Sequence, residues 1–169
     1  MIRCAPTVGL IAAVVSFSGH AKAEDKEPSA IVEIGGASEW GLRDASASFG
    51  PTVAVEVSPL KNWLEIEAGV TPLFSNGHTA WDTDLLFKKP FTLSNTVEFM
   101  LGVGPEWVHA TGSGTSADSI AGEAVLDFMF WPSPERKLGW YLEPSYSYDF
   151  GKGHEQSLGL SVGLLIAIP

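Results

Sequence analysis

The sequence is poor in basic residues and almost free of cysteine. Its 169 residues contain ten Lys and Arg against twenty Asp and Glu, which gives a formal net charge of −10. This shortage of positive charge excludes the basic surface of a typical nucleic-acid-binding protein. Because Cys4 is the only cysteine, an intrachain disulfide is excluded, and stability must come from a protein core or from a membrane.

Long apolar runs are also missing after the first residues, and no later segment has the periodicity of an amphipathic helix. The mean hydropathy of +0.14 is too low for a bundle of membrane-spanning helices. The hydrophobic fraction of 45% is nevertheless too high for a disordered acidic tail. A chain of this length corresponds to about one domain.

The N-terminal segment predicts a secretory signal peptide. Arg3 precedes an apolar run at residues 8–15, and Ala21 and Ala23 supply the small residues of a cleavage site after Ala23. The run is shorter than the roughly 20 residues that a membrane-spanning helix needs. We therefore expect a cleaved signal peptide at residues 1–23, a short lead at 24–29 and one folded domain at 30–169. Cleavage would remove Cys4 from the exported chain.

The rest of the chain alternates between apolar and polar or small residues, which is the period of a β-strand. The pattern is clear where Val53, Val55 and Val57 alternate with Ala54 and Glu56. It predicts eight strands of roughly 11 to 15 residues each. Their alternating segments lie at about residues 30–42, 52–57, 64–71, 79–90, 97–104, 123–130, 142–150 and 157–166.

Short connections separate these segments, and the longest predicted loop is 111–118. Strands joined so tightly pair with their sequence neighbours and run antiparallel. The sequence therefore predicts an all-β, eight-stranded, up-and-down meander, and closure into a barrel would remove its exposed edges.

Two surroundings fit strands with one apolar face. In a soluble lipocalin-like barrel the apolar face surrounds an internal ligand, whereas in a transmembrane barrel it faces lipid and the polar face lines the interior. The predicted strands are long for a soluble protein and match the length of membrane strands.

The six tryptophans favour the membrane alternative because each falls near a predicted strand end. Three at each end would form two interfacial aromatic girdles. With the N-terminus on the periplasmic side, the predicted anchors are Trp40, Trp81 and Trp107 at the outer end and Trp63, Trp131 and Trp140 at the inner end.

The positions of the basic residues also favour the membrane alternative, since a base that faces lipid in the middle of a strand would be costly. Five bases lie at the three predicted periplasmic turns, and none lies mid-strand. These five are Lys61, Lys88, Lys89, Arg136 and Lys137.

The pattern of strands at residues 53–59, 63–69, 99–105 and 158–164 resembles the small eight-stranded outer-membrane barrels of Gram-negative bacteria, the OmpA-barrel and OmpX type. The resemblance covers the whole chain after the signal peptide. It implies residence in the outer membrane as a monomer, contact with outer-membrane lipid, and folding by the outer-membrane assembly machinery.

Strand parity places thirteen acids on the inward face: Glu33, Glu39, Glu56, Glu65, Glu67, Asp82, Asp84, Glu98, Glu106, Glu123, Asp127, Glu143 and Asp149. Lys88, expected near a rim, is the only base with the same parity. Unpaired charges in a confined space are expensive.

Three outcomes are open for these acids. They could remain protonated, share hydrogen bonds with hydroxyl and indole donors and water, or bind or slowly conduct a cation. The candidate binding residues are Glu56, Glu65, Glu67, Glu98, Glu123, Asp127 and Glu143.

Catalytic and metal motifs are weak. The histidines after the signal peptide, His78, His109 and His154, fall on separate outer loops, so no metal site and no cofactor are predicted. A lipid-modifying hydrolase would need a Ser–His–acid arrangement. Only the neighbourhood of His109 offers one, with Ser113, Ser116, Ser119 and Glu106, at a spacing that matches no known signature.

The sequence thus predicts an integral outer-membrane β-barrel without catalytic activity, with a structural, interaction or narrow-pore role. Two alternatives remain. One is an outer-membrane enzyme that modifies lipid A or phospholipid, and the other is a soluble periplasmic lipocalin-like binding barrel.

Overall fold

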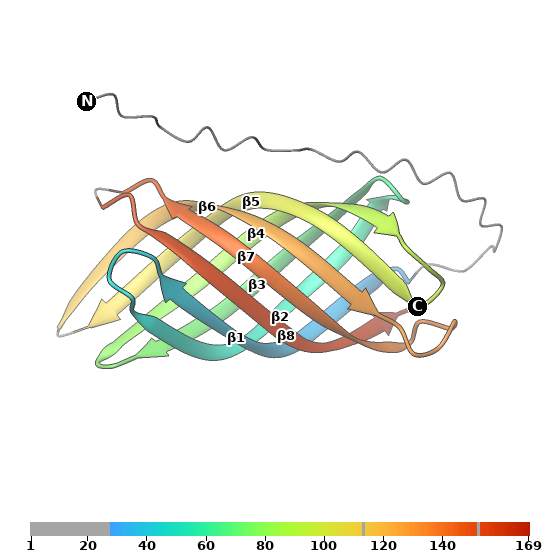
Figure 1. Ribbon diagram of the computed structural model, residues 1–169, viewed down its shortest axis with the longest axis horizontal. Coiled ribbons are helices and arrows are strands. Elements are labelled where there is room, and N and C mark those ends of the chain that lie inside the picture. Colours follow the sequence, from blue (N-terminus) through green and yellow to red (C-terminus); the bar gives the residue numbers. More distant parts are fainter. Residues whose placement is uncertain (1–27, 113, 152) are drawn as a thin grey trace, which may run out of the picture.

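The computed structural model describes residues 28–112, 114–151 and 153–169, which form a closed barrel of eight antiparallel strands (Figure 1). The predicted signal peptide at 1–23 lies outside the described residues. Within them, no helix is long and apolar enough to cross a membrane. The strands are β1 (Ala30–Gly41), β2 (Ala47–Leu60), β3 (Leu64–Ser75), β4 (His78–Thr92), β5 (Val97–Gly112), β6 (Thr115–Phe130), β7 (Leu138–Asp149) and β8 (Gln156–Ile168).

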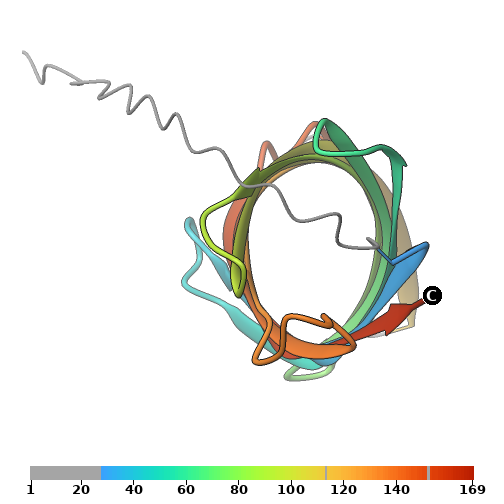
Figure 2. The ribbon, with the colours of Figure 1, turned by 90° about the vertical axis from the view of Figure 1, so that its right-hand side faces the viewer.

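Each strand pairs with its neighbours in sequence, and β1 pairs with β8 from Ala30↔Ile168 to Gly41↔Ser157 to close the ring. Figure 2 looks at the end of the barrel where β1 begins and β8 ends, called here the terminal end. The opposite end, with the β1–β2, β3–β4, β5–β6 and β7–β8 connections, is called the loop end. The prediction of a closed up-and-down barrel is confirmed.

The strands are 12 to 16 residues long, slightly longer than expected. The prediction of a long loop at 111–118 was wrong, because β5 and β6 pair as far as Gly112↔Thr115. Gly114 adopts a positive φ of 79°, which suits a tight hairpin turn between twisted strands. Cross-strand hydrogen bonding therefore extends the sheet through Gly, Ser and Thr residues that show no apolar alternation.

Alternate side chains point to opposite sides of the barrel wall, as predicted. On β2, Val53, Val55 and Val57 are 49, 45 and 40% exposed on the outside, whereas Ala54 and Glu56 between them are buried. The same alternation around the ring leaves an apolar outer surface and an acidic interior. Aromatic side chains pack together on this outer surface near the terminal end, with ring centroids 3.9 Å apart for Phe130 and Trp140 and 5.1 Å apart for Phe99 and Phe128.

Five of the six tryptophans lie exposed near strand ends: Trp40, Trp81 and Trp107 toward the loop end, and Trp63 and Trp140 toward the terminal end. Trp131 is different, and its prediction as an interface anchor was wrong. It is only 1% exposed. The even-numbered residues at the end of β6 point outward, so the next odd position turns into the barrel.

Trp131 belongs to an apolar plug inside the terminal end of the barrel. This plug also contains Ile31, Met100, Met129, Tyr141 and Leu165. The backbone N–H of Trp131 donates to the carbonyl of Thr96 at 2.7 Å, which ties the residue to the neighbouring β4–β5 connection. The plug fills the interior near the terminal end of the barrel.

Candidate functional site in the barrel interior

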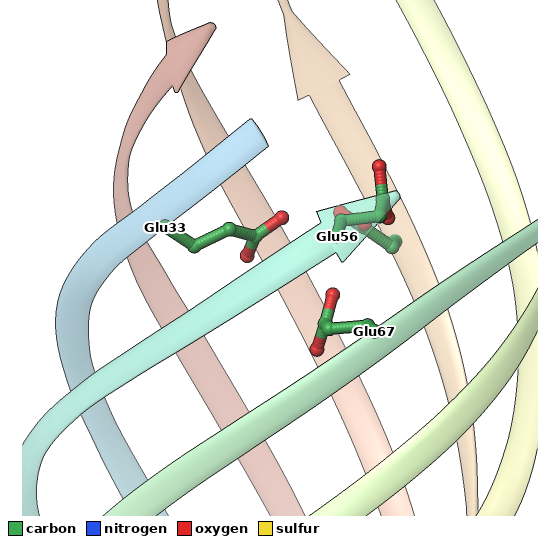
Figure 3. Close-up of side chains that lie close together, drawn as sticks. Glu33, Glu56 and Glu67 are labelled. Carbon is green, nitrogen blue, oxygen red and sulfur yellow. The ribbon is translucent and has the colours of Figure 1, made fainter. Parts of the chain in front are cut away.

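All thirteen acids expected on the inward face are buried or half-buried, so strand parity places them correctly. Alternate positions of adjacent strands present their side chains to the same enclosed space, which an eight-stranded barrel fills with its own side chains. Figure 3 shows three of these acids, Glu33 of β1, Glu56 of β2 and Glu67 of β3, directed toward a common region.

The sequence suggested that Lys88 lies near a rim, but the structure places it at the centre of a group of buried acids. Its side chain is fully buried. The Nζ atom lies 2.5 Å from Glu67, 2.6 Å from Glu143 and 3.0 Å from Asp127, and 3.9 Å from the nearest carboxylate oxygen of Glu56. We refer to Lys88 with these four acids as the Lys88 cluster.

The register of the sheet explains how this cluster forms. Glu56 lies directly opposite Glu67 on β3, and Glu65 lies opposite Lys88 on β4. Asp127 and Glu143 come from β6 and β7, which do not pair with β4 in the sheet. Lys88 spans the interior and donates to carboxylates from three strands. A lysine ammonium group thus supplies the positive charge for four of the seven candidate binding residues.

A second base also enters the interior. Arg136, from the connection between β6 and β7, donates from Nη1 to Glu98 at 2.8 Å. Strand parity could not predict this contact because Arg136 lies outside any strand, in the left-handed region with a φ of 46°. Lys88 is therefore not the only base that neutralises inward acids.

The remaining candidate binding residues lie at different depths. Glu65 is buried at 8% exposure, next to Glu56 and the Lys88 cluster. Glu123 lines a cavity of about 60 Å³, together with Asp84 and with Glu67 and Glu143 of the cluster. The interior therefore does not bring all seven candidates into one site.

A further acid group lies closer to the loop end and was not among the candidate binding residues. Glu39, Asp82 and Glu106, called here the loop-end acid group, have carboxylate oxygens within 4.8 Å of one another. The hydroxyl of Ser147 donates to Glu106 at 2.8 Å. Strand parity predicts that each of the three residues faces inward, but it does not predict that the acids of β1, β4 and β5 lie together.

This group lines a cavity of about 190 Å³ that reaches the β1–β2 and β7–β8 connections. Arg43 and Asp44 lie at its loop end, where Arg43 donates to the carbonyl of Gly153 at 3.1 Å. Hydrogen bonds from the backbone and hydroxyl of Ser46 lower the pKa of Asp44. The mouth of the cavity therefore keeps a carboxylate in its ionised form.

The histidines lie apart from this interior. On neighbouring strands at the loop end, Nδ1 of His109 is 2.7 Å from Asp118. His154 instead contacts the hydroxyl of Tyr148 at 3.2 Å. Among the described residues no serine hydroxyl is hydrogen-bonded to His109, and Ser113 lies outside them. The described residues thus contain a His–Asp pair but no assembled Ser–His–acid arrangement.

No protein-family model matches the chain, and no curated protein sequence matches it. Solved structures do share its fold. The chain is similar to Neisserial surface protein A (14% identity, TM-score 0.66, 82% of this chain and 96% of that one). It is also similar to the N-terminal β-barrel domain of Pseudomonas aeruginosa OprF (13%, 0.58, 80% and 97%) and to Ail, the attachment invasion locus protein of Yersinia pestis (14%, 0.55, 83% and 98%). The chain therefore has the fold of the small eight-stranded outer-membrane β-barrel proteins.

Proposed function

We propose that the protein is an integral outer-membrane β-barrel without catalytic activity, with a structural or interaction role and a closed interior. The apolar outer wall carries this proposal. Across β4, β5 and β6, for example, Leu85, Phe87, Leu101, Val103 and Leu126 are 40 to 58% exposed. Soluble monomers rarely expose continuous apolar surface beyond a few hundred Å², whereas lipid tails solvate such a surface at no cost.

The arrangement of the two faces argues against the soluble lipocalin-like alternative. That barrel would need its apolar face inside and its acids in solvent. Here Glu33, Glu56 and Asp127 are at most 2% exposed in the interior, while Val103 is 58% exposed outside. Exchanging the faces would require a one-residue shift of every strand.

The positions and lengths of the strands support a membrane crossing. A membrane strand needs about 9–11 residues, so strands of 12 to 16 residues can cross and extend beyond the hydrocarbon region. Exposed tryptophans near both ends then lie where interfacial girdles are expected. In this proposal the partners are outer-membrane lipid and, during biogenesis, the assembly machinery, and the predicted signal peptide directs export of a monomer.

A narrow pore is less well supported than a closed barrel. Met100, Met129, Trp131 and Leu165 are at most 1% exposed in the apolar plug, and Lys88 fills the layer next to it. An ion path through the barrel would require both layers to rearrange, because packed interiors leave few voids.

The direct test is fractionation of a Gram-negative host that expresses the full chain. We expect the protein in the outer-membrane fraction after washing with urea, released only by detergent, with a changed gel mobility when unheated. The lipid A mass spectrum of the same cells should be unchanged. Recovery with a soluble periplasmic marker would refute membrane residence, and a modified lipid A species that depends on His109 would refute the non-catalytic role.

A further inference from the structure

We propose that the loop-end acid group, Glu39, Asp82 and Glu106, binds a divalent metal cation, with Ca²⁺ as the best match. The inference goes beyond the proposed role as a membrane barrel. It rests on the spacing of three carboxylates, on an unpartnered buried oxygen, and on the contrast with the Lys88 cluster.

The spacing of the three carboxylates suits one cation. One oxygen from each residue lies within 4.8 Å of the other two. Ca²⁺ binds oxygen at about 2.3–2.6 Å, so two ligands on opposite sides of the ion are about 4.6–5.2 Å apart. The limit of 4.8 Å on each pair lies within this range, so the spacing of every pair of oxygens is compatible with Ca²⁺. Mg²⁺, with bonds of about 2.0–2.1 Å, requires every pair to lie within about 4.2 Å.

The side chain of Asp82 provides a second observation that points to a bound cation. The residue is 6% exposed and lines both interior cavities. Its Oδ1 atom is buried and has no hydrogen-bond partner. A buried carboxylate oxygen without a partner is costly, and a bound cation removes that cost.

No base of the described residues forms an ion pair with this group. Arg43 lines the same cavity, but its Nη1 donates to the carbonyl of Gly153. Glu106 accepts a hydrogen bond from Ser147, a neutral donor. Asp84, Asp149 and Glu155 lie along the same two cavities and add further negative charge.

A second acid group in the barrel, which overlaps the Lys88 cluster, contains a base. Glu33, Glu56, Glu67 and Asp127 also have oxygens within 4.8 Å of one another, but the Nζ atom of Lys88 lies 2.5 Å from Glu67 and 3.0 Å from Asp127. The ammonium group of Lys88 thus supplies there the positive charge that a metal cation would otherwise supply. The oxygens of the loop-end acid group meet the same distance limit, and within the part of the chain that the structure describes no lysine or arginine forms an ion pair with them.

The surrounding cavity can complete the coordination. Ca²⁺ takes six to eight oxygen ligands and accepts water among them. A cavity of about 190 Å³ leaves room for several water molecules beside the ion. Because it reaches the β1–β2 and β7–β8 connections, the ion can enter from the loop end.

Calorimetric titration of the full-length barrel tests this proposal. The protein is folded in zwitterionic detergent, so that no anionic lipid binds metal, then stripped with chelator and titrated with CaCl₂ and separately with MgCl₂. We expect saturable binding at one site, tighter for Ca²⁺. Asp82→Asn should weaken Ca²⁺ binding by about tenfold or more, since even groups beyond the direct ligands change metal affinity by about 10–100-fold.

Asp118→Asn is the matched control, because it makes the same chemical change at an exposed loop-end acid that pairs with His109 and lines neither interior cavity. It should change the affinity by less than about twofold. Absence of saturable binding to the unsubstituted protein would overturn the proposal, and so would an equal loss in both variants. If Asp82→Asn does not fold, Glu106→Gln is measured in its place, with the same expected loss and the same contradicting results.

Discussion

Lys88→Met is expected to lower the free energy of unfolding by about 3–5 kcal/mol, the usual effect of removing one partner from a buried ionic network. Methionine has a similar length but no charge. The substitution leaves Glu67, Asp127 and Glu143 buried without the ammonium group that lies within 3.0 Å of each of them. The loss comes from uncompensated negative charge and not from a cavity.

The measurement is urea-induced unfolding and refolding in lipid vesicles, followed by tryptophan fluorescence. Lys89→Met is the matched control, because the adjacent Lys89 is half-buried and donates to the backbone carbonyl of Asn62 at 2.5 Å. It should cost less than about 1 kcal/mol. Equal losses for the two variants would contradict the assignment of Lys88 as the cation of the interior.

Val103→Arg is expected to destabilise the membrane-inserted barrel by about 2–4 kcal/mol, the cost of an arginine that faces lipid at the bilayer midplane. Val103 is 58% exposed on the outer wall, in the middle of β5. In a water-soluble barrel the same exposed position would tolerate arginine to within about 0.5 kcal/mol. The substitution therefore distinguishes lipid from water outside the barrel.

Asn76→Arg, in the exposed β3–β4 turn at the loop end, adds the same charge where water surrounds the side chain. Both variants are unfolded with denaturant in the same vesicles. We expect the substitution at position 103 to lower the free energy of unfolding and the turn variant to leave it unchanged. A neutral result at both positions would place the outer wall in water.

The two faces of the barrel wall could be predicted from the sequence because side-chain direction in a strand depends only on parity. The alternation of Val53, Ala54, Val55 and Glu56 therefore places the acid inside and the valines outside. Short connections supply the antiparallel order in the same local way. The bounds of the strands are harder to predict from the sequence, since hydrogen bonding extends β5 and β6 through polar residues up to Gly112 and Thr115.

Contacts across the interior could not be predicted, because they depend on how the closed sheet is staggered. Lys88 of β4 meets Asp127 of β6 and Glu143 of β7, which are not its neighbours in the sheet. Likewise, Glu39 of β1 meets Asp82 of β4 and Glu106 of β5. The alternation along a strand predicts whether each of these side chains points inward, but it does not predict which other side chain it contacts.

Residues just beyond strand ends are also hard to place from the sequence. The position of Trp131 near a strand end suggested an interface anchor, although the alternation of β6, continued by one residue, directs it inward. Arg136 lies in a connection, where alternation carries no information, and reaches Glu98 through the conformation of the turn.

The central claim is that the apolar face of the strands contacts lipid, and spin labelling along β5 tests it most directly. Residues 28–169 contain no cysteine, so single cysteines from 98 to 103 can be labelled one at a time in vesicles. We predict that accessibility to lipid-soluble oxygen is highest at Phe99, Leu101 and Val103 and lowest at Glu98, Met100 and Gly102. Oxygen maxima at the even positions, or a water-soluble nickel chelate reaching the odd ones, would contradict the account.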